Sequence, residues 1–203
     1  MISNNDELTL VEKAKVFCTH LLKNRLPANL IFHNYHHTAA VAEAALQIGC
    51  NSGLPEAELQ LLSVAAWFHD TGYCVKYKGH EDVSKLLAAT FLQAQGADEK
   101  IQAQVAACIE ATRQPQNPHM LLEQVLCDAD LSHLGMQIFY VSSQKLKQEI
   151  ELVKGNIISD TEWHRQNIFF LENHTFFTPY AKKMYSGQQH KNILQERKFL
   201  LSS

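Results

Sequence analysis

The residue pair best suited to chemistry in this chain is His69-Asp70. It ends the apolar stretch 61–68 and is followed at once by Thr71-Gly72, where a helix would stop. Imidazole together with carboxylate is the ligand set that zinc, iron and manganese favour. Trp67 and Phe68 indicate that the segment is buried, and a buried ionised aspartate needs a metal or a charged partner. Together with histidines at 33–37 and aspartates at 128 and 130, the pair predicts a divalent-metal site and hydrolytic chemistry on a phosphate ester.

Two other parts of the chain offer further ligands. His37 precedes the alanine-rich apolar stretch 38–46, so it can lie at the edge of the core and point inward. Asp128 and Asp130 lie two positions apart in an apolar segment and face different sides of a helix. One aspartate can bind metal while the other accepts a hydrogen bond from a ligand histidine, and the spacing leaves open which does so. A core histidine, an N-cap-like aspartate and a core salt bridge are the alternatives.

Long helices must position these residues, because only 8 glycines and 5 prolines interrupt 203 residues. Strand-like alternation is weak throughout, so we expect an all-α fold with roughly eight or more helices. The expected helices are one ending before Pro27, one from Asn34 to Gly49 or Gly53, one from Pro55 to the His69-Asp70 pair, then 81–95, 98–114 and 120–134, followed by two or three more with breaks near Gly155, Pro179 and Gly187. The segment 72–79 is expected to be a loop.

Composition and charge are those of an ordinary globular chain, most simply a single domain over residues 1–203. The net charge of -3 gives no reason to expect a polyanionic partner such as bulk nucleic acid. The five cysteines are scattered and include no Cys-x-x-Cys, which fits a reducing compartment. Residues 1–7 lack the pattern of a signal peptide, and no apolar run has the length of a membrane span. We therefore expect a cytoplasmic protein without membrane contact.

Four stretches follow one another in an order known from one protein family. They are His33–Val41 with the sequence HNYHHTAAV, Trp67–Tyr73 with WFHDTGY, Gly79–Ser84 with GHEDVS, and Asp128–Gly135 with DADLSHLG. This order resembles the HD superfamily of metal-dependent phosphohydrolases, which is named for its His-Asp pair. The resemblance covers about residues 30–135. It implies a compact helical bundle, with residues 140–203 as a C-terminal helical extension similar to that of a poorly characterised bacterial branch.

The resemblance also implies which residues bind metal. The implied ligands are His37, His69, Asp70 and Asp130, and the implied ion is manganese, iron, nickel, cobalt or zinc. His80 stands in a motif that supplies a further ligand in some branches. Other branches often carry another histidine after Thr112, where this chain has Arg113. We therefore expect one metal position and leave open a second, which magnesium could also occupy.

The implied activity is hydrolysis of a nucleotide, a cyclic nucleotide or a related small phosphoester by a metal-activated water. The first stretch is also similar to the Tyr-His-Asn-x-x-His segment of cyclic-nucleotide phosphodiesterases. The histidine before the asparagine is the general acid in those enzymes, and it matches His33 here. Asp70 would orient the hydroxide, and His33 or His80 would protonate the leaving group. Arg113 and Lys78 are candidates to hold the phosphate, or are solvated surface charges. The sequence leaves open whether the protein forms a homodimer.

Two other functions remain as alternatives. The chain could be a non-catalytic signalling or scaffold module that has kept a metal site. It could also be an iron-dependent oxygenase, because some relatives in the superfamily carry a di-iron centre. That centre needs six or more ligands, for which His80 and His119 are the available additions. Metal-dependent turnover of a phosphoester separates the hydrolase from both.

Overall fold

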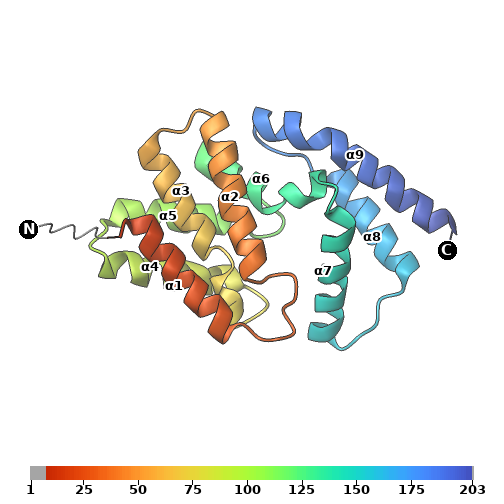
Figure 1. Cartoon of the computed structure of the whole chain (residues 1–203), viewed down its shortest axis with the longest axis horizontal. Coiled ribbons are helices and arrows are strands. Elements are labelled where there is room, and N and C mark those ends of the chain that lie inside the picture. Colours follow the sequence, from red (N-terminus) through yellow and green to blue (C-terminus); the bar gives the residue numbers. More distant parts are fainter. Residues whose placement is uncertain (1–7, 203) are drawn as a thin grey trace, which may run out of the picture.

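The computed structural model describes residues 8–202, so the expectation for residues 1–7 lies outside the described part of the chain. Within that part the chain is helical and contains no strand, which confirms the all-α prediction (Figure 1). The elements are α1 (Leu10–Arg25), α2 (Tyr35–Asn51), α3 (Glu56–Phe68), the 3-10 helix η1 (Thr71–Cys74), α4 (His80–Ala94), α5 (Glu99–Ala111), α6 (Leu121–Asp130), the 3-10 helix η2 (Ser132–Gly135), α7 (Phe139–Lys154), α8 (Asp160–Asn173) and α9 (Pro179–Ser202). None of these helices combines the length and the apolar character that a membrane span requires.

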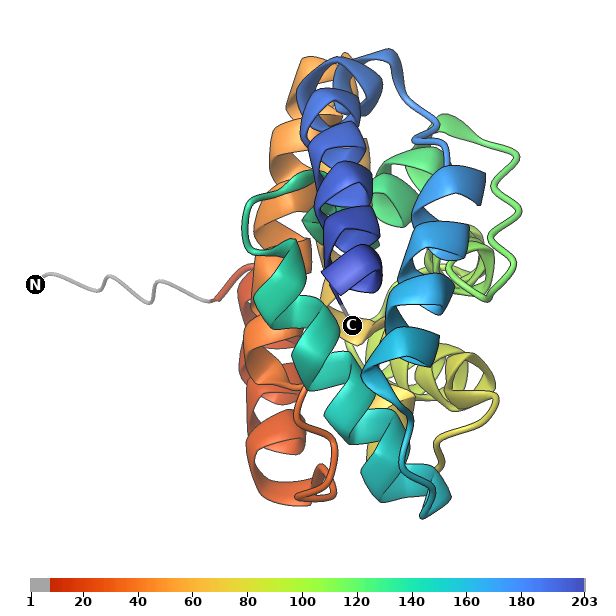
Figure 2. The ribbon, with the colours of Figure 1, turned by 90° about the vertical axis from the view of Figure 1, so that its right-hand side faces the viewer.

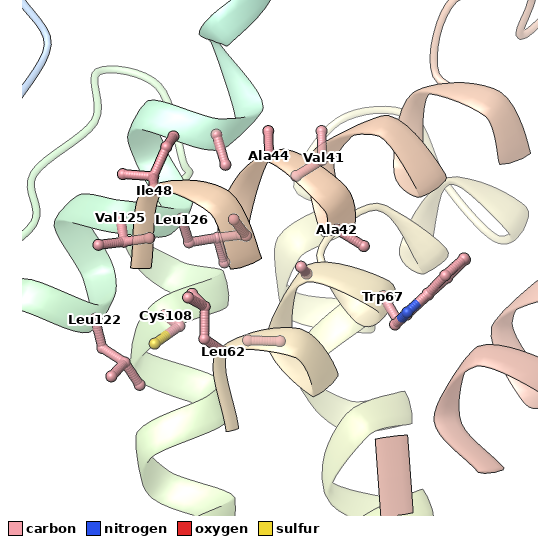
Figure 3. Close-up of a cluster of buried hydrophobic side chains, with 14 of the residues drawn as sticks. Val41, Ala42, Ala44, Ile48, Leu62, Trp67, Cys108, Leu122, Val125 and Leu126 are labelled. Carbon is pink, nitrogen blue, oxygen red and sulfur yellow. The ribbon is translucent and has the colours of Figure 1, made fainter. Parts of the chain in front are cut away.

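Helix α3 is the centre of the first bundle. Its last seven residues, Leu62–Phe68, are all buried, and α1, α2, α4, α5 and α6 pack around it. A helix that is apolar on every side has to be enclosed by others, which explains its central position. Figure 3 shows the core where α2, α3, α5 and α6 meet, with Ile48, Leu62, Cys108 and Leu126 among its side chains. The end of this buried helix is where His69 and Asp70 lie.

Helices α7, α8 and α9 form a second group beside the bundle (Figures 1 and 2). Helix α9 packs along α8 and against η2. Gly135 allows this approach, because a Cβ atom at this position would lie 2.3 Å from the Cβ of Tyr185. The C-terminal extension is therefore joined closely to the segment that follows Asp130, one of the expected metal ligands.

Most expected helices are present, and three expectations were wrong. Gly187 does not break α9, because an exposed glycine inside a helix costs only about 1 kcal/mol relative to alanine. The buried side chains of Tyr185 and Gln189 on either side hold the helix in place. The segment 120–134 is not one helix, since α6 ends at Asp130 and η2 follows. The expected loop 72–79 likewise begins within η1.

Candidate metal centre

His37 lies in the first turn of α2, which Asn34 caps. The Asn34 side-chain oxygen accepts hydrogen bonds from the backbone N–H groups of His36 (2.8 Å) and His37 (3.4 Å). This cap orients the start of the helix, so that His37 points toward the end of α3 while its neighbour His36 is exposed. Of the two adjacent histidines, only His37 therefore turns inward.

His69 and Asp70 occupy the junction between α3 and η1. The His69 ring donates a hydrogen bond from Nδ1 to the carbonyl oxygen of Ala66 at 2.7 Å, which leaves the Nε2 lone pair available. Asp70 precedes η1, but its side chain makes no capping hydrogen bond there. Both side chains are buried. The local structure therefore leaves one imidazole nitrogen and one carboxylate unused by the backbone.

Four side-chain atoms converge at this junction. His37 Nε2 lies 3.4 Å from Asp70 Oδ2 and 3.2 Å from Asp130 Oδ1. His69 Nε2 lies 3.2 Å from Asp70 Oδ2 and 3.6 Å from Asp130 Oδ1. Metal–ligand bonds of about 2.1 Å would separate neighbouring ligand atoms by about 3.0 Å in an octahedron and about 3.4 Å in a tetrahedron. The observed spacings fit a single transition-metal ion.

Two atoms of this cluster lack a hydrogen bond. His69 Nε2 and Asp70 Oδ2 are buried, and neither makes a hydrogen bond of acceptable geometry. Buried polar atoms are almost always satisfied, and such an orphaned pair is expected where an ion would bind. His37, His69 and Asp70 also form a group of potential ligand atoms within 4.8 Å of one another. The donor set of imidazole and carboxylate suits manganese, iron, cobalt, nickel or zinc.

The charges of the cluster stabilise one another. Burial opposes the charged form of His37, but Asp130 and Asp70 outweigh it and raise the pKa of His37 to about 9. Burial likewise opposes the ionised form of Asp70, and the imidazoles of His69, His37 and His80 nonetheless hold the pKa of Asp70 well below its usual value. Metal binding would have to displace the protons on the two ligand histidines, since only the neutral imidazole coordinates.

His80 and His33 flank the cluster, and Tyr73 separates them. His80 Nε2 lies 3.2 Å from Asp70 Oδ1, so the second oxygen of that aspartate faces this histidine. The Tyr73 ring stacks on the His80 ring at 3.7 Å between centroids and on the His33 ring at 4.6 Å. Gly72 brings α4 close enough for this arrangement, because a Cβ atom there would lie 1.9 Å from the His80 carbonyl oxygen.

Glu149 on α7 is a site residue that the sequence analysis missed. Its buried carboxylate contacts Nδ1 of His33 and accepts hydrogen bonds from the backbone N–H groups of Phe32 (2.8 Å) and His33 (3.0 Å). A glutamate within the expected helix 139–154 has nothing in its local sequence that links it to His33. Only its position on a face that proves buried distinguishes it from Glu151, which is half-buried.

A cavity of about 740 Å³ opens over the metal cluster. Asp70, Asp130, His33, Tyr73 and His80 line it on the side of the first bundle. Its other wall comes from α7 and α8, which contribute the largely apolar set Phe139, Leu146, Ile150, Trp163, Phe169 and Phe170. His133 also lines the cavity; burial and the charge of His37 lower the pKa of His133 to about 4, so this imidazole is neutral at pH 7. The size suits a small-molecule ligand.

The two cations expected to hold phosphate do not line this cavity. Lys78 is exposed in the segment before α4. Arg113 instead pairs with three carboxylates, those of Glu110 (2.6 Å), Asp82 (2.7 Å) and Glu81 (3.0 Å). It thereby ties the end of α5 to the start of α4, beside His80. His119 is exposed and does not line the cavity either.

Asp128 turns away from the metal cluster. Its two carboxylate oxygens accept hydrogen bonds from the backbone N–H groups of Phe177 (2.7 Å) and Thr178 (2.8 Å). It therefore acts as an N-cap-like aspartate for the distant segment that begins α9. The structure thus separates the two aspartates left open by spacing: Asp130 joins the cluster, and Asp128 holds the C-terminal helices.

The family comparison identifies the same part of the chain. The family model described as "HD domain" matches residues 34–135, about half of the 203 residues. This range begins at the Asn34 cap and ends at Gly135, so it contains all four residues of the cluster. No curated protein matches the sequence.

Three solved structures resemble the chain over nearly its whole length. A predicted HD superfamily hydrolase from an uncultured Thermotogales bacterium is 20% identical, with a TM-score of 0.63 over 94% of this chain and 91% of its own. YpgQ from Bacillus subtilis, solved in complex with ADP, is 15% identical, with a TM-score of 0.64 over 95% and 94%. A Lactobacillus plantarum protein is 17% identical, with a TM-score of 0.67 over 95% and 99%. At these identities the likeness concerns the fold, and it includes α7–α9.

Proposed function

Since this chain belongs to the HD-domain family, whose members bind divalent metals, we propose that it is a metal-dependent phosphohydrolase acting on a nucleotide or another small phosphoester. One observation carries the proposal. His37, His69, Asp70 and Asp130 direct four ligand atoms to one point at the wall of a cavity, and two of those atoms are buried without a hydrogen bond. Such unsatisfied atoms beside a ligand-sized cavity support a metal centre that a substrate can reach.

Residues around the metal centre would orient the ligands and protonate the leaving group. A bound divalent ion would lower the pKa of a water molecule toward neutrality and polarise a phosphoryl oxygen. Asp70 would hold the ion through Oδ2, while its Oδ1 faces His80, so His80 orients this carboxylate. His33 is held at Nδ1 by Glu149, which leaves Nε2 to donate a proton to the departing alkoxide. The aromatic ring of Tyr73 keeps the two histidines apart.

The surroundings of His80 favour one firm metal position. Glu81, the neighbour of His80, pairs with Arg113, and Arg113 itself stands where other branches often carry a further histidine. His119 lies outside the cavity. This ligand supply supports hydrolysis more than the chemistry of a di-iron oxygenase, which needs six or more ligands.

The test is metal reconstitution of the full chain. We would remove metals with a chelator, add manganese, cobalt, nickel, iron or zinc, and measure the bound metal and the hydrolysis of 4-nitrophenyl phosphate, bis(4-nitrophenyl) phosphate, cyclic nucleotides, AMP and ADP. ADP is included because YpgQ was solved with it. We expect about one tightly bound ion per chain and metal-dependent release of product.

A matched pair of variants makes the test specific. Asp70→Asn should abolish both metal retention and turnover, because it removes the charge from a ligand oxygen. Asp82→Asn removes the same charge from an exposed carboxylate outside the cavity and should preserve both. Stoichiometric metal without turnover on any ester would instead indicate the non-catalytic module.

A further inference from the structure

Apart from histidines, the charged side chains that line the cavity are acidic with one exception. Four carboxylates line it, those of Asp70, Glu81, Asp130 and Glu162. A phosphoester is an anion, and such a wall repels it unless cations compensate. The metal centre supplies positive charge on the side of the first bundle. Among the lining residues the only lysine or arginine is Arg165, on α8.

The Arg165 side chain is also available to bind a ligand. Within residues 8–202 it takes part in no ion pair and no hydrogen bond of its side chain, and it is exposed. Arg113 and Arg197, by contrast, pair with acidic residues. A guanidinium offers five donors in a planar fork that matches the oxygens of a phosphate. An unpaired fork on the wall of a ligand-sized cavity is suited to binding an anion.

The position of Arg165 separates it from the metal centre. The metal ligands come from α2, α6 and the end of α3, whereas α8 packs mainly on α9 and forms the far wall of the cavity. Figure 1 shows α8 on the side of the molecule away from α3. The same helix carries the aromatic rings of Trp163, Phe169 and Phe170 into the cavity wall, where they offer a surface for an apolar or aromatic body.

We propose that Arg165 binds a phosphoryl group of the substrate other than the one at the metal centre, so that the preferred substrates are organic diphosphates or triphosphates with an aromatic body. This inference rests on the proposed function and names the substrate class of the same site. One phosphoryl group lies at the metal centre, the second pairs with the Arg165 guanidinium, and the ring system packs on the α8 wall.

The test compares two ligands that differ by one phosphoryl group. Dissociation constants of AMP and ADP would be measured by calorimetry on the manganese-loaded full chain. We expect wild type to bind ADP more tightly than AMP. A hydrogen bond between charged groups corresponds to about tenfold to a hundredfold in affinity, and Arg165→Gln should weaken ADP by this factor while changing AMP little.

Two control variants sharpen the result. Arg165→Lys keeps the charge without the fork and should restore part of the ADP affinity. Lys183→Gln removes the same charge from an exposed position on α9 outside the cavity and should leave both affinities unchanged. Because Arg165 is exposed and unpaired, its variants should melt at the wild-type temperature, which excludes unfolding as the cause.

Three results would overturn the inference: ADP binds wild type no better than AMP, neither nucleotide binds, or Arg165→Gln weakens both nucleotides equally. The last result would mean that Arg165 contacts the phosphoryl group at the metal. Failure of the proposed function is recognised separately, because it appears as absent turnover of every ester by wild-type protein. The binding measurement does not depend on turnover.

Discussion

The buried carboxylate of Glu149 contacts the ring of His33, which precedes it in the chain by 116 residues. The same carboxylate accepts two backbone N–H groups of the segment that leads into α2. Burial disfavours its charge, but His33 and these N–H groups lower the pKa of Glu149 and keep it ionised. A residue of the C-terminal helices therefore positions a candidate acid that belongs to the first bundle.

Glu149→Gln should lower kcat by about tenfold to a hundredfold, because general acid catalysis contributes about 10²–10⁴-fold and depends on the orientation of the imidazole. KM and metal content should change little. Steady-state kinetics of the reconstituted enzyme measures this. Glu151→Gln, which removes the same charge two residues later in α7, should retain kcat.

A double variant tests whether Glu149 acts through His33. If it does, His33→Asn/Glu149→Gln should lose no more of kcat than His33→Asn alone. Losses of kcat that multiply independently would argue against this role.

Asp128→Ala should destabilise the fold by about 3 kcal/mol, since it leaves one buried and one half-buried N–H group at the start of α9 without acceptors. Urea denaturation would measure the change in the free energy of unfolding. Asp98→Ala, which removes an exposed cap of α5, should cost about 1 kcal/mol. Metal content should survive in both variants under native conditions. Loss of metal from folded Asp128→Ala protein would place this aspartate at the metal centre instead.

The stability of the metal-free protein should fall as the pH rises from about 6.5 to about 9. The pKa of His37 is raised to about 9 by Asp130 and Asp70, against the opposing effect of burial. A group whose pKa is higher in the folded state stabilises it fully below the unfolded pKa, about 6.5 for histidine, and this stabilisation disappears as the pH passes the folded value. Melting temperatures of chelated protein across this range measure the effect.

His37→Gln serves as the control for this pH dependence. It removes the titrating ring, so its melting temperature should vary less between pH 6.5 and 9 than that of the wild type. An equal slope in both proteins would assign the dependence to other groups. Saturating metal should also flatten the wild-type profile, because the ion takes the place of the protons.

Gly72→Ala should damage the site and the fold together. The new Cβ would lie 1.9 Å from the His80 carbonyl oxygen, so α4 must move away from Asp70. We expect a loss of about 2 kcal/mol in stability and a clear fall in metal affinity. Gly187→Ala is the matched control, because no atom lies within 4 Å of its Cβ position in α9. It should add up to about 1 kcal/mol of stability. Unchanged metal affinity in Gly72→Ala would show that α4 does not position the site.

The grouping of His37, His69, Asp70 and Asp130 was largely predictable from the sequence, because these residues stand at helix ends that local chemistry marks. Asn34 caps α2 two residues before His36 and three before His37, and the apolar α3 ends at His69-Asp70. Turn chemistry and hydrophobic periodicity act over a few residues, and the order of the motifs supplied Asp130. The same local reasoning predicted most helices but failed at Gly187, where packing of α9 outweighs the weak helix propensity of glycine.

The rest of the site depends on contacts between residues far apart in the chain, which no local pattern records. Glu149 reaches His33, and Asp128 receives the start of α9, only because α7–α9 pack beside the first bundle. Spacing could not distinguish Asp128 from Asp130. The position of Arg113 beside the motifs made it a candidate phosphate ligand, although in the fold it pairs with three carboxylates. Charge partners and cavity walls are set by how helices pack, and that packing brought Arg165 to the cavity.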